Sequence, residues 1–306
     1  MKPSSFAPWL IAIAALAASA AGAAAQKLDD TPRVALISAF EPEWGVHHEK
    51  LTDTAEYNRA GVRFVTGRLA GRDVVLFLSG VSMVNAAMTT QMAIDSFNLD
   101  SIVFSGIAGG VDPDLNIGDV VIAEQWGPYL DMVLARQTGD TYTVPPFFGT
   151  PYPNYGMIFP QGVEVRSADG PPQGMFWFKT DPDLLADARK AAAGMTLDDC
   201  DSADACLSAA PKIVVGGNGV SGTAFVDNAD FRQYVSDTFD AKVLDMESAA
   251  VAQVSHANGL PFIVFRSLSD LAGGSEAANE MEVFMALAAK NSAAVVEAFL
   301  KETAAK

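Results

Sequence analysis

Short apolar runs alternate with longer segments of helical character along most of the chain. The apolar runs are rich in β-branched residues and contain few polar ones, which is typical of strands buried on both faces of a sheet. We expect strands at 33–37, 62–67, 73–78, 101–104, 118–124, 212–216, 242–244 and 261–266. We expect helices at 83–97, 182–193, 228–239, 248–256 and 277–301. This alternation predicts a single α/β domain in which helices cover both faces of a mixed, mostly parallel sheet.

Residues 127–180 interrupt the alternation. Prolines and aromatic residues crowd into this segment at 145–148, 151–155 and 176–178, without a helical or strand period. We therefore expect a long inserted loop, which is uncommon within a compact domain and is often functional. Two interpretations are open. The segment is either a lid or binding element, or an insertion that packs its aromatic side chains on the surface or against another subunit.

Residues 1–25 have the features of a secretory signal peptide. Lys2 precedes an apolar run from Trp9 to Ala18, and Ala23-Ala24-Ala25 precedes Gln26. This order of a charged, an apolar and a small-residue region is typical of a cleaved signal. The run is shorter than the roughly 20 residues that span a bilayer, which argues against a retained anchor. We expect a periplasmic or secreted mature chain of residues 26–306 that leaves the membrane after cleavage.

The acidic composition limits the macromolecules that this chain can bind. The formal net charge is −17 at pH 7. A surface of that charge repels nucleic acid and anionic lipid, so we expect neither as a partner. Small substrates respond to local charge only, and the net charge does not constrain them.

Cys200 and Cys206 are the two cysteines of the chain. Export permits a disulfide, and the spacing suits the closure of a small loop. Two free thiols are the main alternative. A metal site is disfavoured because two thiolates with no histidine nearby make an incomplete ligand set.

Two carboxylates follow neighbouring apolar strands. Glu247 follows the strand at 242–244 and opens a helix of small residues, and Asp270 follows the strand at 261–266 and opens a Gly-containing loop. Ligands of open α/β sheets bind beyond the carboxyl ends of the strands. Glu247 and Asp270 can therefore share one ligand. One would hold a sugar while the other protonates a leaving group.

Six motifs in a fixed order carry a resemblance to a known family. They are Ile37-Ser38-Ala39-Phe40-Glu41-Pro42-Glu43, Ser79-Gly80-Val81, Ser105-Gly106-Ile107-Ala108-Gly109-Gly110 with Ile117-Gly118-Asp119-Val120, Ser221-Gly222-Thr223-Ala224-Phe225-Val226, Asp245-Met246-Glu247 and Arg266-Ser267-Leu268-Ser269-Asp270. With them, residues 33–301 resemble the nucleoside phosphorylase/nucleosidase superfamily. The resemblance is strongest to its methylthioadenosine/S-adenosylhomocysteine nucleosidase branch and to exported bark-storage-like members. It implies a three-layer nucleoside phosphorylase-like fold, a purine nucleoside as ligand, no cofactor or metal, and a homodimer.

The resemblance also implies roles around the sugar. Glu43 corresponds to the carboxylate that activates water, and Asp270 to the acid that protonates N7 of the leaving purine. Glu247 corresponds to the residue that binds the ribose hydroxyls, with Met246 beneath the sugar and Ser79 beside it. A carboxylate near the sugar and a proton donor at the leaving group suit an oxocarbenium-like transition state. The alternatives are structural: Glu43 and Glu247 as acids at helix starts, and Asp270 as a loop cap.

Four further residues are expected to hold the base. Phe225 corresponds to the aromatic residue that stacks on the purine, and the Val226 backbone to the group that binds the base edge. The backbone of Ala108 and Gly109 is expected to approach the base closely. Apart from the resemblance, Phe225 could equally be a core aromatic, and Gly109 could belong to an ordinary turn.

The superfamily includes enzymes that use water and enzymes that use phosphate as the nucleophile. The residues at the anion-binding positions indicate which of the two applies here. Phosphorylases of this superfamily bind phosphate through arginines, whose planar guanidinium suits an oxyanion. Residues 38–44 contain no arginine, and Ser79 occupies the other position. Water is therefore the expected nucleophile, and hydrolysis to free base and sugar the expected reaction. A phosphorylase, a non-catalytic nucleoside-binding or storage protein, and a transport accessory protein are the alternatives. Thr223 replaces an acid that is usual in the nucleosidases, which leaves the preferred 5′-substituent open.

Overall fold

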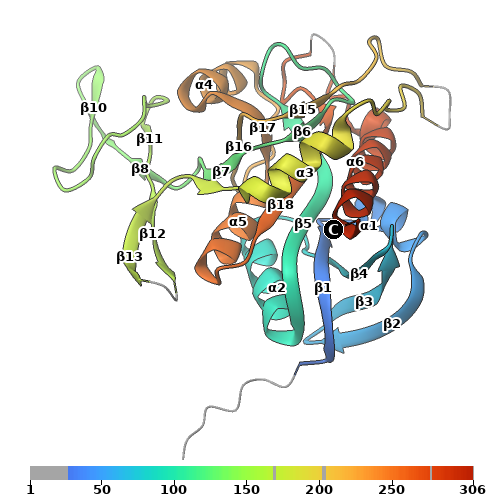
Figure 1. Cartoon of the computed structure of the whole chain (residues 1–306). Coiled ribbons are helices and arrows are strands. Elements are labelled where there is room, and N and C mark those ends of the chain that lie inside the picture. The colour runs from blue at the N-terminus through green and yellow to red at the C-terminus, as the bar shows by residue number, and fades with distance from the viewer. Residues whose placement is uncertain (1–26, 168–169, 202–204, 276–277, 306) are drawn as a thin grey trace, which may run out of the picture.

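A mixed sheet of 12 strands forms the centre of the computed structural model, which describes residues 27–167, 170–201, 205–275 and 278–305 (Figure 1). The main path runs β14-β7-β16-β17-β5-β1-β4-β3-β2, and β18, β6 and β15 join it through β5. The strands are β1 Asp29–Ser38, β2 Thr52–Arg59, β3 Val62–Leu69, β4 Arg72–Leu78, β5 Phe97–Gly110, β6 Val120–Ile122, β7 Gln125–Pro128, β14 Phe178–Lys179, β15 Ile213–Val215, β16 Asn218–Ser221, β17 Ala241–Asp245 and β18 Phe262–Asp270. The expected signal peptide lies outside the described residues.

Parallel pairing dominates the middle of the sheet. Strand β1 pairs in parallel with β4 and β5, and β5 pairs in parallel with β18. Strand β17 runs antiparallel to the end of β5, so that Gly109 lies opposite both Leu244 of β17 and Asp270 of β18. The ends of three strands thus meet around one glycine.

Helices cover both faces of the sheet, which confirms the predicted three-layer α/β fold. The helices are α1 Glu41–His48, α2 Met83–Ser96, α3 Pro182–Ala192, α4 Ala229–Phe239, α5 Ser248–Ala257 and α6 Met281–Ala304. Successive side chains of a strand point to opposite faces. Val34 and Leu36 of β1 accordingly belong to the apolar cluster that contains residues of α3 and α6. Ala35 and Ile37 belong to the cluster that contains residues of α2 and α5.

Most of the expected elements are present, and the expected hairpin is β3–β4. The expected elements lack β2, β7, β14 and β16, and they include α1 only as the helix start proposed as an alternative for Glu43. Strand β2 is polar and its residues are mostly exposed, so it carries no apolar signal. Strand β16 has only four residues, too few to show a period, and includes Gly219, whose side-chain position is filled by the ring of Trp126.

The prediction that residues 127–180 form a structureless loop is wrong. The segment contains short antiparallel pairs, β9–β10, β8–β11 and β12–β13, which extend to one side of the main sheet (Figure 1). Their strands are β8 Met132–Leu134, β9 Arg136–Thr138, β10 Thr141–Thr143, β11 Ile158–Pro160, β12 Val163–Ser167 and β13 Gly170–Met175. Strands of three residues show no period, and exposed hairpins need no apolar face, so the sequence pattern carries no trace of them.

The aromatic residues of this segment divide into two groups. Tyr152, Phe176 and Trp177 contact the ring of Phe239 in α4, at centroid distances of 5.1, 5.3 and 6.5 Å. Phe147 and Phe148 form an outer group and are 80% and 43% exposed. The inner group anchors the segment to the domain, whereas the outer group remains on the surface.

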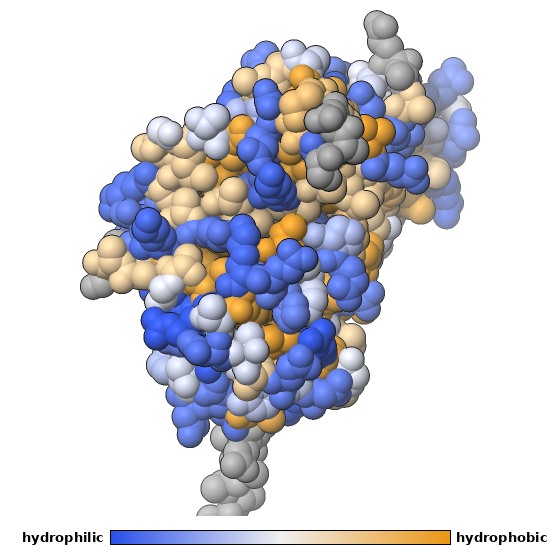
Figure 2. All heavy atoms as spheres, turned by 90° about the vertical axis from the view of Figure 1, so that its right-hand side faces the viewer, coloured by the Kyte–Doolittle hydropathy of each residue, from blue (hydrophilic) through white to orange (hydrophobic). Residues whose placement is uncertain are grey.

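Among the described helices, α6 has the length and apolar composition of a membrane span. Ten of its residues are buried, and it packs against β18 and β5, so its apolar character is that of a core helix. Figure 2 shows hydrophilic residues over much of the face at the right of Figure 1, with apolar residues in scattered patches.

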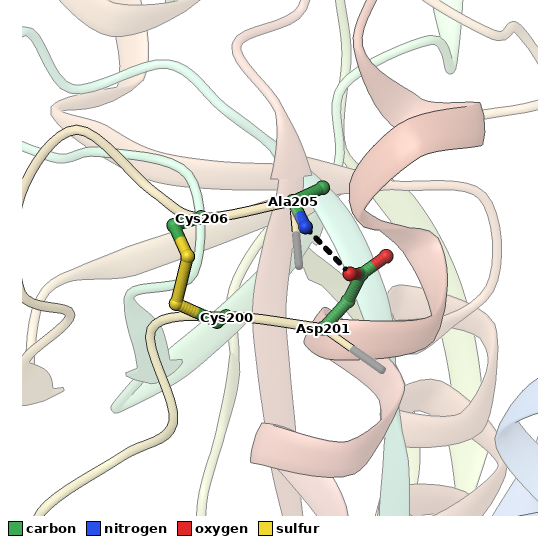
Figure 3. Close-up of a disulfide and its surroundings, with 4 residues drawn as sticks. All are labelled: Cys200, Asp201, Ala205 and Cys206. Carbon is green, nitrogen blue, oxygen red and sulfur yellow. Dashed lines mark hydrogen bonds between the residues drawn. A yellow bond between two sulfur atoms is a disulfide. The ribbon is translucent and has the colours of Figure 1, made fainter. Parts of the chain in front are cut away.

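A disulfide joins Cys200 to Cys206 (Figure 3). The backbone N–H of Ala205 donates to the Asp201 carboxylate across the same loop, over 2.9 Å. The bond closes a small loop, as the spacing of the two cysteines predicted.

Candidate active site

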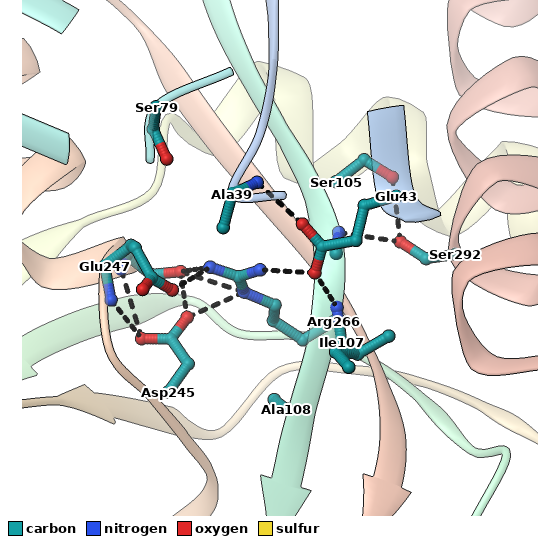
Figure 4. A network of polar contacts seen from close by, with 12 residues as sticks. Ala39, Glu43, Ser79, Ser105, Ile107, Ala108, Asp245, Glu247, Arg266 and Ser292 are labelled. Atoms are coloured by element: carbon teal, nitrogen blue, oxygen red, sulfur yellow. Dashed lines mark hydrogen bonds and ion pairs between the residues drawn. The ribbon is translucent and has the colours of Figure 1, made fainter. Parts of the chain in front are cut away.

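A pocket lies where β5, β17 and β18 end, bounded also by α1 and the start of α6. Eight of the nine residues expected to bind or react with the ligand line it, namely Glu43, Ala108, Gly109, Phe225, Val226, Met246, Glu247 and Asp270. Ser79 does not line it. Its hydroxyl donates to the carbonyl of Gly80 over 2.9 Å, and it makes none of the contacts drawn in Figure 4. A ribose contact from Ser79 stays a prediction.

Glu43 is held at the start of α1 by two backbone donors. Its Oε2 accepts from the N–H of Ala39 over 2.6 Å, and its Oε1 accepts from the N–H of Ile107 over 2.7 Å. The side chain is buried, and burial raises the pKa of Glu43, while Arg266 and the backbone donors oppose the rise. Glu43 therefore is an acid at a helix start, as one interpretation held, and it also lines the pocket.

Arg266 is the site residue that the sequence reasoning missed. It is 0% exposed and lies among three carboxylates (Figure 4). Its Nε is 2.7 Å from Asp245 Oδ2, its Nη2 3.5 Å from Glu247 Oε2, and its Nη1 3.8 Å from Glu43 Oε1. An arginine within an apolar strand could have revealed this cluster, because a buried cation is tolerated only beside anions.

The guanidinium of Arg266 also packs over the ring of Phe104, 4.1 Å from the ring centroid. Gly106 makes room for it. A β-carbon built on Gly106 would lie 2.1 Å from Arg266 Nη1 and 2.4 Å from Glu43 Oε1. The motif around Gly106 therefore serves the ion cluster as well as the backbone of the pocket.

Glu247 immediately precedes α5, as predicted. Its Oε1 accepts from the backbone N–H of Ser82 over 2.7 Å, which ties the pocket to the start of α2. Burial, and then the negative charge of Asp245, raise the pKa of Glu247 to about 7. The carboxyl is thus near its titration point at neutral pH.

Asp270 ends β18 and also lines the pocket. Its Oδ1 accepts from the N–H of Ala272 over 2.8 Å, and its Oδ2 accepts from the hydroxyl of Ser269 over 3.0 Å. Burial raises the pKa of Asp270, although these donors and Asn279 oppose the rise. A carboxyl that keeps its proton to higher pH is suited to act as a general acid.

The side of the pocket near Asp270 is apolar and close to the backbone. Phe225 is 57% exposed and borders the pocket, so the interpretation of this residue as a core aromatic is wrong. Val226 is buried beside it. At Gly109, a β-carbon would lie 3.3 Å from Asp270 Oδ1, so glycine leaves the carboxyl room. Phe225, Val226 and the backbone of Gly109 thus line the same pocket, and their contact with a base stays a prediction. Within the described ranges, no group of His, Cys, Asp and Glu is arranged to hold a metal ion.

We predict that Gly106→Ala disrupts the ion cluster. The added methyl group overlaps Arg266 and Glu43, and overpacking of this kind costs about 1–3 kcal/mol in the free energy of unfolding. Chemical denaturation should show that loss. The control is Gly45→Ala in α1, where a β-carbon meets no atom within 4 Å. It should be neutral or stabilise by up to about 1 kcal/mol. Equal stability of the two variants would contradict the close approach at Gly106.

The comparisons with known proteins agree with this geometry. A family model described as the phosphorylase superfamily matches residues 33–301. The 5′-methylthioadenosine/S-adenosylhomocysteine nucleosidase of Tolumonas auensis is 31% identical over 272 residues, which cover 88% of this chain and 99% of that protein.

Two solved structures of nucleosidases with the same name share the fold. The one from Neisseria meningitidis, in complex with methylthio-immucillin-A, has a TM-score of 0.65 at 27% identity and covers 88% of this chain and 98% of its own. The one from Colwellia psychrerythraea, in complex with adenine, has a TM-score of 0.68 at 29% identity and covers 90% and 97%. The resemblance inferred from the motifs is confirmed, and the chain belongs to the phosphorylase superfamily.

Proposed function

We propose that this protein hydrolyses the N-glycosidic bond of purine ribonucleosides of the methylthioadenosine/S-adenosylhomocysteine type and releases free base and sugar. One observation carries the proposal: Glu43, Glu247 and Asp270 line the same pocket, with Phe225 at its border. The relatives named as nucleosidases support it. A pocket with three acids of raised pKa suits a reaction that both takes up and gives back protons.

In this proposal each acid has a separate step. The purine lies against Phe225, and Asp270 donates its proton to N7 as the bond from C1′ to N9 breaks and its electrons pass to the base. Glu247 accepts hydrogen bonds from the ribose hydroxyls, which strengthen as the sugar becomes cationic. Water attacks C1′ and gives its proton to Glu43. Glu43 then releases this proton to solvent, and Asp270 takes up a proton from solvent, which restores both acids.

Water suits this pocket better than phosphate as the nucleophile. The pocket lining contains no lysine or arginine. Arg266 lies behind it, and its N–H groups face Asp245, Glu247, Glu43 and the hydroxyl of Ser248. A phosphate beside the sugar would meet carboxylates instead of free guanidinium donors. The phosphorylase alternative therefore lacks an anion site among the described residues.

We predict that the three acids are separable by mutation. Asp270→Asn and Glu43→Gln should each lower turnover by at least about 10²-fold while nucleoside still binds, because general acid–base catalysis contributes about that factor or more. Glu247→Gln should weaken binding and turnover together. The control is Glu41→Gln, which removes an exposed acid from the same helix and should leave turnover unchanged.

The assay incubates the protein with adenosine, inosine, methylthioadenosine and S-adenosylhomocysteine, with and without phosphate. We expect free base and free sugar, with no acceleration by phosphate. Formation of ribose 1-phosphate would assign the protein to the phosphorylases. If no purine nucleoside released its base, the function of a nucleoside-binding or storage protein would remain.

We also propose that the protein is exported and functions in the periplasm or outside the cell. The signal-like residues 1–25 and the disulfide between Cys200 and Cys206 support this location. The prediction is that protein recovered from the cell envelope or medium begins near Gln26 and carries the closed disulfide. Intact mass before and after reduction and alkylation measures both. A chain that begins at Met1, or two thiols that react without reductant, would contradict it.

We further propose a homodimer that covers the mouth of the pocket. Val84 and Met88 of α2 are 76% and 52% exposed, and Val81, which lines the pocket, is 47% exposed. Apolar side chains gathered at one place on the surface are typical of protein interfaces. Sedimentation at micromolar concentration should give the mass of a dimer, and Val84→Glu should lower it to a monomer. A wild-type monomer would contradict the proposal.

A further inference from the structure

Glu43, Asp245, Glu247 and Arg266 form a cluster that we call the pocket floor. This cluster carries more negative than positive charge. Among the described residues, Arg266 is the one cation in contact with Glu43, Asp245 and Glu247, and the side chains of all four are at most 6% exposed. With all groups ionised the cluster would have a net charge of −2, in a place where water cannot screen it. Such a surplus is costly unless a proton or a cationic ligand compensates it.

Asp245 contributes one of these charges and lines the pocket, but donors of the protein surround its carboxylate oxygens. Its Oδ2 accepts from Arg266 Nε over 2.7 Å and from the hydroxyl of Ser248. Its Oδ1 accepts from the hydroxyl of Ser221 and from the backbone N–H groups of Glu247 and Ser248, over 3.2 and 3.1 Å. Five donors of the protein thus surround the carboxylate. Asp245 can therefore act on a reaction through its charge and through its contacts with Arg266 and Glu247, instead of by a hydrogen bond to the ligand.

We propose that Asp245 is a positioning residue that fixes Arg266 between Glu43 and Glu247. It also adds one negative charge to the pocket floor, beyond the charges of Glu43 and Glu247. The inference rests on the proposed function. A neutral nucleoside gains little from the surplus, but a sugar that has become an oxocarbenium ion compensates it. Interactions that are stronger in the transition state than in the ground state raise kcat and leave KM nearly unchanged.

The same surplus sets the pH dependence of the free enzyme. Glu247 faces Asp245 of β17, Arg266 of β18, Glu43 of α1 and the N–H of Ser82. Burial and the charge of Asp245 raise the pKa of Glu247 to about 7. As the pH falls below this value, Glu247 gains a proton and can no longer accept from both ribose hydroxyls. Removal of the Asp245 charge lowers that pKa, so the acid limb of kcat/KM must move to lower pH.

The test variant is Asp245→Asn, which keeps the shape and removes the charge. With its nitrogen in place of Oδ2, the new amide donates to the hydroxyl of Ser248, while its oxygen keeps the donors of Oδ1 and Arg266 Nε keeps the Ser248 hydroxyl as an acceptor. We expect kcat to fall by about 10-fold or more with KM within about 3-fold, and the acid limb to move down by about one pH unit. Affinity for an analogue with a protonated ring nitrogen in the sugar should fall about 10-fold relative to its uncharged counterpart. The control is Asp112→Asn, a charge paired with Lys242 outside the pocket lining, which should change none of these.

A purely structural role for Asp245 would lower activity while the acid limb and the preference for the cationic analogue stay unchanged, and this result would overturn the proposal. A second measurement needs no variant. Binding of the cationic analogue to the wild-type protein near pH 6.5, followed by calorimetry in two buffers, should release a proton because the cation compensates the acidic floor. No proton release would overturn the inference. A wild-type protein that binds both analogues but cleaves no nucleoside would refute the proposed hydrolysis separately, because the binding measurements still judge the charge surplus.

Discussion

The buried guanidinium of Arg266 is the interaction on which the site depends. A cation without water must lie beside anions, and the anions here come from three separate elements: Glu43 from α1, Asp245 from the end of β17 and Glu247 from the start of α5. Removal of any one acid would leave the rest of the cluster with altered charge in a medium that does not screen it. The cluster therefore joins the folding of these elements to the geometry of the pocket.

Burial also affects the three acids of the proposed reaction. Desolvation raises the pKa values of Glu43, Glu247 and Asp270, and in each case backbone or side-chain donors limit the rise. The partners that oppose the rise in pKa differ between Asp270 and the other two acids. Asp270 has no arginine among its partners and is the natural proton donor, whereas Glu43 and Glu247 share Arg266 and are suited to accept hydrogen bonds and protons. Environment thus separates the roles of chemically similar side chains.

The segment 127–180 extends to one side of the main sheet, and none of its described residues lines the pocket (Figure 1). Its inner aromatic residues pack on Phe239 of α4, and α4 in turn follows the loop that carries Phe225 and Val226. The outer aromatics, Phe147 and Phe148, remain exposed. The segment is therefore anchored to the helix that follows the loop of Phe225 and Val226, and it presents apolar surface at Phe147 and Phe148.

The sequence by itself determined the α/β class, the order of most helices and strands, the hairpin at β3–β4, and eight residues of the pocket, because apolar periodicity and the short motifs are local properties of the chain. The short strands of 127–180 and the polar strand β2 carry no such local signal, and only pairing in three dimensions defines them. The tertiary structure alone decided that Arg266 and Asp245, 21 residues apart, form one cluster with Glu43. It also decided that the hydroxyl of Ser79 donates to the carbonyl of the neighbouring Gly80. A buried charge takes its partners from whichever elements the fold brings together, and no spacing along the chain specifies that choice.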